Sequence, residues 1–167
     1  MKKIVLVIGG MFLALAMSAC GGGGSAGSSV SSCAGGSSAS SGSANVTTLS
    51  YNDIQVGSGA ALVSGNTATL NVTGYLYNSA NSSNFNEGTI FQPTYKQTGT
   101  AIGVGNFITG FDQGLLLGAG TNSALKVGGT RIITIPASLA YGVCAPPTSN
   151  IPPNSALVFV VTLNSIP

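Results

Sequence analysis

The stretch IGVGNFITGFDQGL, residues 102–115, decides the fold of this chain. Within it Phe107, Phe111 and Leu115 recur at four-residue spacing. This spacing predicts a short helix over residues 108–116, with one apolar face able to pack on a sheet. Two glycines inside the predicted helix lower its helix propensity, so packing must hold the helix in place.

Strand signals lie on both sides of this helix in the sequence. Residues 67–76 alternate between apolar and polar side chains, and residues 157–163 repeat the pattern. A third run, residues 131–135, is stopped by Pro136. Alternation of period two predicts half-buried strands. Two weaker strand candidates complete the set: residues 49–56 and the segment around Ile102. Several strands with one short apolar helix predict an α+β fold.

The beginning of the chain has the pattern of an export signal. Two lysines follow the initiating methionine, and an apolar stretch then continues to Met17. This stretch is too short and ends too abruptly to favour a stable membrane span. We therefore predict a signal peptide over residues 1–19.

The segment Met17-Ser18-Ala19-Cys20 resembles the lipobox of bacterial lipoproteins. The resemblance implies that Cys20 is acylated, becomes the new N-terminus and anchors the chain to a membrane. Two alternatives remain, ordinary secretory cleavage near Ala19 and an uncleaved anchor. All three interpretations export the chain. Gly21 stands where some bacterial lipoproteins carry the aspartate associated with inner-membrane retention, which favours the outer membrane over the inner one.

Residues 20–45 are predicted to comprise the lipidated cysteine and a flexible tether, because Gly, Ser and Ala dominate this segment. The folded domain is predicted to span residues 46–167. With Cys20 consumed by lipid, Cys33 and Cys144 remain as an even pair in an oxidising compartment. A disulfide between them would tie the tether to a loop of the domain. The alternative is two free or intermolecularly paired thiols.

Charged side chains are scarce and balanced. Beyond the leader there are three basic and three acidic residues: Lys96, Lys126, Arg131, Asp53, Glu87 and Asp112. Such a chain lacks the basic surface that nucleic-acid binding needs, so nucleic acid is excluded as a partner. No histidine is present, which removes the commonest general base and metal ligand. We predict no metal and no cofactor. The three carboxylates show no partner in the sequence, and we expect them to be helix caps or surface groups.

Three motifs follow one another in the second half of the chain. They are residues 102–115, then Val127-Gly128-Gly129-Thr130-Arg131 with Leu139-Ala140-Tyr141-Gly142, then Ile151-Pro152-Pro153-Asn154-Ser155-Ala156-Leu157. In this order they resemble the FKBP-type peptidyl-prolyl cis/trans isomerases, and the resemblance extends over residues 49–166. It implies a curved antiparallel β-sheet wrapped around one short α-helix, with a shallow apolar pocket between them. It also implies isomerisation of X-Pro peptide bonds without a cofactor.

The resemblance assigns roles to individual residues. The implied catalytic residues are Tyr141, Phe111, Ile108, Phe91 and Phe159. Tyr141 would offer its hydroxyl to a substrate carbonyl, and Ile108 would offer its backbone N–H as a second donor. Phe111 would form the floor under the proline ring, between walls made by Phe91 and Phe159. The implied substrate-binding residues are Val72, Gln92, Phe107 and Ile151. The alternative is that these side chains are ordinary core residues, above all Phe159 and Ile108.

The chain departs from the family pattern at three positions. Val72 stands in place of a tyrosine, Gln92 replaces an acidic residue, and Thr98 falls where an aromatic wall is expected. Gln92 can still form hydrogen bonds but brings no charge, and Thr98 would admit water.

The sequence leaves three candidate functions. The first is an isomerase that accelerates proline-limited folding of exported proteins by binding their proline-containing segments. The second is a non-catalytic chaperone or binding module with a degenerate pocket, and the third is a structural surface protein.

Overall fold

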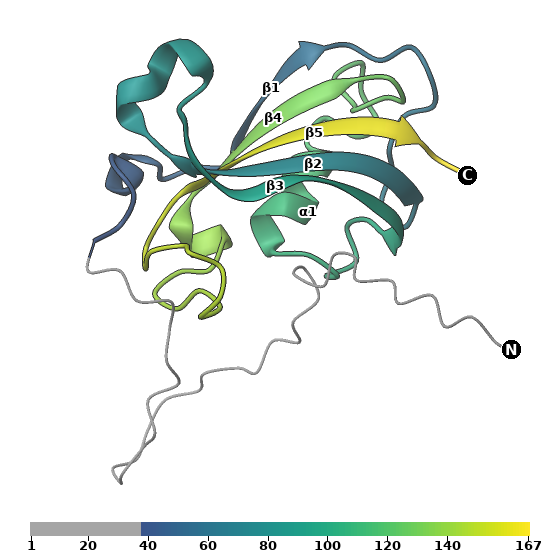
Figure 1. Ribbon diagram of the computed structural model, residues 1–167. Helices are drawn as coiled ribbons and strands as arrows, with labels where there is room; N and C mark the ends of the chain where they lie inside the picture. The colour runs from purple at the N-terminus through teal and green to yellow at the C-terminus, as the bar shows by residue number, and fades with distance from the viewer. Residues whose placement is uncertain (1–37) are drawn as a thin grey trace, which may run out of the picture.

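The computed structural model describes residues 38–167, and within them five strands form one antiparallel sheet of order β1-β4-β5-β2-β3. The strands are β1 (Ser50–Gln55), β2 (Thr67–Tyr77), β3 (Glu87–Ala101), β4 (Thr130–Ile135) and β5 (Leu157–Ser165). The helical elements are α1 (Thr109–Leu116) and three 3-10 turns, η1 (Ser43–Asn45), η2 (Ser79–Asn84) and η3 (Ala137–Leu139). The predicted α+β class is confirmed: the sheet is curved and α1 lies against one of its faces (Figure 1).

The predicted signal peptide, the lipidation site Cys20 and the cysteine Cys33 lie outside the described residues. Within the described part of the chain, no helix is long and apolar enough to cross a membrane.

Two glycines allow α1 to approach the sheet closely. A Cβ atom on Gly110 would collide with Ile135, and one on Gly114 would collide with Ile133. Phe111 from the same helix is completely buried. The glycines that weaken the isolated helix are therefore the residues that let it pack against β4, as the sequence argument requires.

Arg131 connects the end of this helix to the edge of the sheet. Its side chain is fully buried and donates to both carboxylate oxygens of Asp53, with Nε to Oδ1 at 2.6 Å and Nη2 to Oδ2 at 2.9 Å. The same guanidinium donates to four backbone carbonyl oxygens, those of Gly114, Leu115, Leu117 and Ser123. The last carbonyls of a helix have no partner within the helix, so this cation caps α1.

Two of the three carboxylates differ from the expectation of caps or surface groups without partners. Asp53 is paired with Arg131, which lies 78 residues away and becomes a neighbour because β1 pairs with β4. Asp112 is buried and accepts hydrogen bonds from the backbone N–H groups of Gly103 at 2.8 Å and Gly105 at 2.9 Å. Asp53 therefore joins β1 to β4, and Asp112 joins α1 to the loop that precedes it.

Strand β3 is the element that the sequence pattern fails to predict. The pattern offers only a segment around Ile102, whereas β3 is 15 residues long and ends at Ala101. Its pairing with β2 is interrupted by four register shifts, and its burial does not alternate. A bulged edge strand shows no period of two, so alternation cannot reveal it.

We expect Arg131→Leu to destabilise the domain by about 3–5 kcal/mol, because the change leaves Asp53 and the helix carbonyls without their donor. The free energy of unfolding in urea measures this effect. Lys96→Leu removes a positive charge from an exposed position on β3 and serves as the control, with an expected change under about 0.5 kcal/mol. Equal losses in the two variants would contradict the role of Arg131.

Candidate functional site

A hollow of about 50 Å³ opens at the end of the sheet where β4 ends and β5 begins. Its lining comprises Phe91, Gln92, Tyr141, Thr148, Ser149, Ile151 and Phe159. Five of the site residues implied by the family resemblance are therefore brought together, while Thr148 and Ser149 were not among them. The described residues give the hollow aromatic rings, hydroxyls and one amide, and Tyr141 is the only ionisable side chain among them.

Aromatic rings form one wall of the hollow and continue into the core. The ring of Phe91 on β3 meets that of Phe159 on β5 edge to face, with centroids 5.6 Å apart. Phe159 contacts Phe111 on α1 at 5.1 Å, and Phe111 contacts Phe107 at 5.3 Å. Edge-to-face and tilted contacts suit the quadrupoles of aromatic rings. The wall is therefore fixed by packing between β3, β5 and α1.

Gly74 on β2 allows Phe91 to take this position. A Cβ atom on Gly74 would lie 2.6 Å from Cζ of Phe91 and 3.0 Å from Cβ of Gln92. Only glycine therefore leaves room for the ring that lies across β2. The available signal in the sequence is a glycine inside an otherwise regular strand, which marks a close approach.

Tyr141 is held by the backbone that follows it. The N–H of Gly142 donates to the carbonyl of Ala137 at 2.9 Å, and the carbonyl of Gly142 accepts from the N–H of Asn154 at 2.7 Å. The Tyr141 hydroxyl itself has no hydrogen-bond partner among residues 38–167. The backbone N–H of Ile108 likewise donates to no group in this range. Both donors that the family resemblance implies are thus available to a ligand.

The phenols in this region are kept neutral. Burial raises the pKa of Tyr141 above its ordinary value of 10. The pKa of Tyr95 rises to about 12, because of burial first and the nearby Tyr141 phenol second. A neutral phenol is a hydrogen-bond donor, so Tyr141 can donate over the whole physiological pH range.

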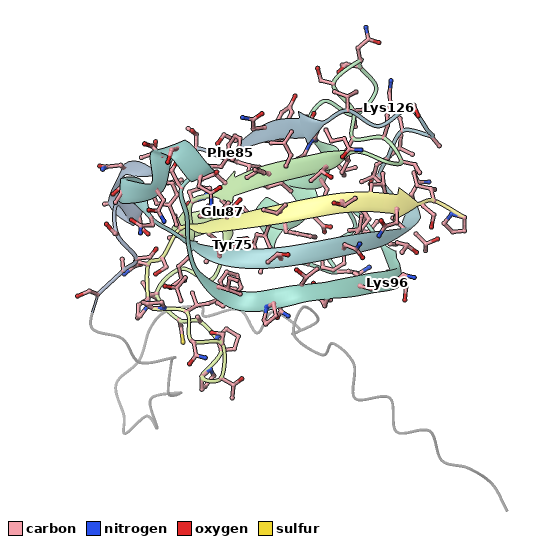
Figure 2. The ribbon with its side chains drawn as sticks, turned by 45° about the horizontal axis from the view of Figure 1, so that its top comes forward. Tyr75, Phe85, Glu87, Lys96 and Lys126 are labelled. Atoms are coloured by element: carbon pink, nitrogen blue, oxygen red, sulfur yellow. The ribbon has the colours of Figure 1, made fainter. Side chains whose placement is uncertain are left out.

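The charged side chains on the surface lie apart from one another. Lys96 and Lys126 lie toward one end of the sheet and Glu87 toward the other, where Tyr75 is found (Figure 2). Burial and then the charge of Glu87 raise the pKa of Tyr75. Among residues 38–167, no side chain that is charged at neutral pH lines the hollow.

Four of the implied site residues do not line the hollow. Phe111 and Val72 are completely buried, Phe107 is nearly so, and half-buried Ile108 packs against the same core. Phe111 does not line the hollow, so the expected floor under the proline ring is one ring deeper than the surface wall made by Phe159.

The open wall expected at Thr98 is not found there. Thr98 is exposed on β3 and does not line the hollow. The aromatic residue that β3 contributes beside Phe91 is Tyr95, which lies opposite Val72 in the sheet and packs against the core. Tyr95 is not among the residues predicted from the sequence, because the register shifts in β3 hide which of its side chains face inward.

Cys144 lies in the loop between β4 and β5 and is disulfide-bonded. Its proposed partner Cys33 is outside the described residues, so the pairing of these two cysteines stays a prediction.

A larger hollow, of about 230 Å³, lies at the other end of the sheet near Tyr51, Asp53 and Lys126. Its carboxylate, Asp53, is already bound by Arg131. This hollow contains none of the residues implied by the family resemblance, and we place the functional site at the aromatic hollow.

The raised phenol pKa values predict how stability changes in alkali. A tyrosine with a raised pKa in the folded state contributes stability below its unfolded pKa of 10, and this contribution is lost as pH rises toward about 12. The free energy of unfolding should therefore fall between pH 10 and 12 in the wild-type protein. It should fall less in Tyr95→Phe, as measured by urea unfolding at fixed pH steps. An equal decline in both proteins would argue against a buried Tyr95 phenol.

Comparison with known proteins identifies the family of this chain. The family described as FKBP-type peptidyl-prolyl cis-trans isomerase matches residues 59–164. The chain is 38% identical over 118 residues to FK506-binding protein 4 of Dictyostelium discoideum, an alignment that covers 70% of this chain but only 28% of that protein. It is 34% identical over 119 residues to the FK506-binding protein of Neisseria meningitidis, covering 70% of this chain and 94% of that protein.

The crystal structure of AtFKBP13 is similar in fold and in sequence. It superposes with a TM-score of 0.56 at 32% identity and covers 71% of this chain and 93% of that one. The matching family region spans more than half of the 167 residues. With the sheet, the helix and the aromatic hollow in place, this chain belongs to the FKBP-type peptidyl-prolyl cis/trans isomerase family.

Proposed function

We propose that this chain is a peptidyl-prolyl isomerase that accelerates the folding of exported proteins. The observation that carries the proposal is an aromatic hollow whose one phenol, Tyr141, has no hydrogen-bond partner among the described residues. The hydroxyl is accessible from solvent rather than sealed in the core, so it can donate to a ligand that enters the hollow.

The chemistry of the reaction suits a site without acids or bases. Rotation about an X-Pro bond breaks amide resonance and has a barrier of about 18–20 kcal/mol. The twisted amide has a smaller dipole than the planar amide. Transfer from water into an apolar hollow therefore costs the twisted amide less free energy than the planar one, which lowers the barrier to rotation. The proline ring would lie against Phe159 and Phe91, and Tyr141 would donate its hydroxyl to a substrate carbonyl. No proton is transferred and no covalent bond forms.

A non-catalytic binding module remains the alternative. Gln92, in place of an acidic residue, donates through Nε2 to the carbonyl of Pro93 at 3.2 Å and brings no charge to the hollow. A hollow of this kind could hold extended proline-containing segments without accelerating their isomerisation. The same assay separates the two functions.

We expect Tyr141→Phe to lower kcat/KM about five- to tenfold on a proline tetrapeptide in a protease-coupled assay, because the change removes one hydrogen bond to the substrate. The protein used begins at Gly21 and is kept oxidised. Tyr75→Phe removes a phenol outside the hollow and is the matched control, with unchanged kcat/KM expected. A wild-type protein that binds unfolded polypeptide without acceleration would favour the binding module.

We also propose that the chain is exported and held at the bacterial envelope by a lipid on Cys20, at the outer membrane rather than the inner one. The proposal is supported by the signal-peptide pattern of residues 1–19 and by the lipobox resemblance of residues 17–20. The folded domain would then act on proline-containing segments of proteins that reach the envelope.

Anchoring can be measured directly in bacterial cells. An alkyne fatty acid supplied during growth should label the wild-type chain and leave Cys20→Ser unlabelled. Cys33→Ser should keep the label, which controls for a general effect of cysteine loss. Labelling of the Cys20→Ser chain, or a soluble wild-type chain released without lipid, would exclude the anchor.

A further inference from the structure

The segment that leads into the domain is folded onto it. We define the N-terminal strap as residues 40–46, which include η1. The strap overlaps the end of the predicted flexible tether, residues 20–45, and has the same Ser- and Gly-rich composition. Despite this composition, the strap is folded onto the domain. Figure 1 places the strap at the end of the sheet where η2 and the loop between β4 and β5 also lie.

Hydrogen bonds attach the strap to the residues just before β5. The Ser40 N–H donates to Oγ of Ser155 at 2.9 Å, and the Ala156 N–H donates to Oγ of Ser43 at 2.9 Å. The Ser40 and Ser43 hydroxyls are 2.6 Å apart, and Ser40 Oγ also donates to the Ala156 carbonyl at 3.4 Å. Ser43 and Ser155 are buried, with exposed fractions of 4% and 3%. Buried polar groups that satisfy one another in this way form a specific attachment.

A second attachment joins the strap to η2. The Ser79 N–H donates to the Ser41 carbonyl at 3.1 Å. Gly42 has a φ of +77°, and a Cβ atom there would collide with Ser79. The strap is therefore held on two sides, by the approach to β5 and by the turn after β2.

The residues that the strap holds are connected to the hollow on both sides. Asn154 to Ala156 lie between Ile151 and Phe159, which both line the hollow. The Asn154 N–H donates to the carbonyl of Gly142, the residue after Tyr141. Displacement of the strap would therefore free the backbone on which Tyr141 and Phe159 depend.

From these contacts we propose that Ser43 and Ser40 are positioning residues for the aromatic hollow, through their bonds to Ala156 and Ser155. They act through the backbone and touch no substrate. The strap lies outside residues 59–164, the region that the family match covers, so family membership does not imply this role. The proposal rests on the proposed isomerase function for its activity readout, but its structural readout is independent of activity.

The principal test compares Ser43→Ala with Thr130→Val in the oxidised chain that begins at Gly21. Thr130 forms a hydroxyl pair with Thr162 at 2.9 Å, at the other end of the sheet, so its variant also removes one hydroxyl contact between elements. Amide hydrogen exchange by NMR should be about tenfold faster at Asn154 and Ala156 in Ser43→Ala only. Exchange at Gly128, whose N–H donates to the Leu163 carbonyl at 2.8 Å, is the internal reference and should not change.

Isomerase kinetics give the second readout. We expect kcat/KM to fall about three- to tenfold in Ser43→Ala and to be restored at least in part by Ser43→Thr, which keeps the hydroxyl. It should be unchanged in Thr130→Val, even where the two variants lose equal stability. Should Ser43→Ala fail to fold, Ser40→Ala, which keeps the bond between Ser43 and Ala156, replaces it in both measurements.

Amide exchange at Asn154 that is the same in Ser43→Ala as in the wild type would overturn the proposal. A loss of kcat/KM in Thr130→Val equal to that in Ser43→Ala would overturn it as well. A wild-type chain without isomerase activity would overturn the proposed function instead. In that case the exchange at Asn154 and Ala156 alone would decide whether the strap positions the hollow.

Discussion

Helix α1 lies so close to β4 that only glycine fits at positions 110 and 114. This approach brings the end of the helix to the buried Arg131, which caps it and binds Asp53 on β1 at the same time. A short helix with two glycines would not persist in water on its own. Its stability comes from contacts with β4.

The same packing determines the hollow. Because α1 is held against the sheet, Phe111 meets Phe159 from inside, and Phe159 can then support Phe91 at the surface. Gly74 leaves room for the Phe91 ring across β2. An apolar site of this kind needs rigid walls more than reactive groups, since its effect depends on excluding water around a rotating amide. The rings of Phe111, Phe159 and Phe91 therefore form one row that packs the core at one end and lines the hollow at the other.

The sequence predicted the parts of the structure that leave a periodic or motif signal. This group contains the helix and four of the five strands. It also contains five residues that line the hollow: Phe91, Gln92, Tyr141, Ile151 and Phe159. Strand β3 escaped because its bulges destroy alternation, and Tyr95 escaped with it. The ion pair between Asp53 and Arg131 joins residues 78 positions apart. The hydrogen bond between Ala156 and Ser43 joins residues 113 positions apart. No local sequence pattern encodes contacts over such separations. A Ser- and Gly-rich composition also conceals a strap whose order comes from hydrogen bonds rather than from apolar burial.

At Val72, where the family pattern has a tyrosine, the neighbouring strand contributes a tyrosine of its own, Tyr95. Val72 and Tyr95 are directly opposite each other on β2 and β3. Opposed side chains in an antiparallel pair lie on the same face of the sheet, so Tyr95 faces the core as Val72 does. Burial raises the pKa of Tyr95 most, and the Tyr141 phenol raises it further. A phenol that the family carries on the second strand is thus present on the neighbouring strand. Tyr95 packs against the core and does not line the hollow, so among the described residues Tyr141 alone brings a phenol to the hollow itself.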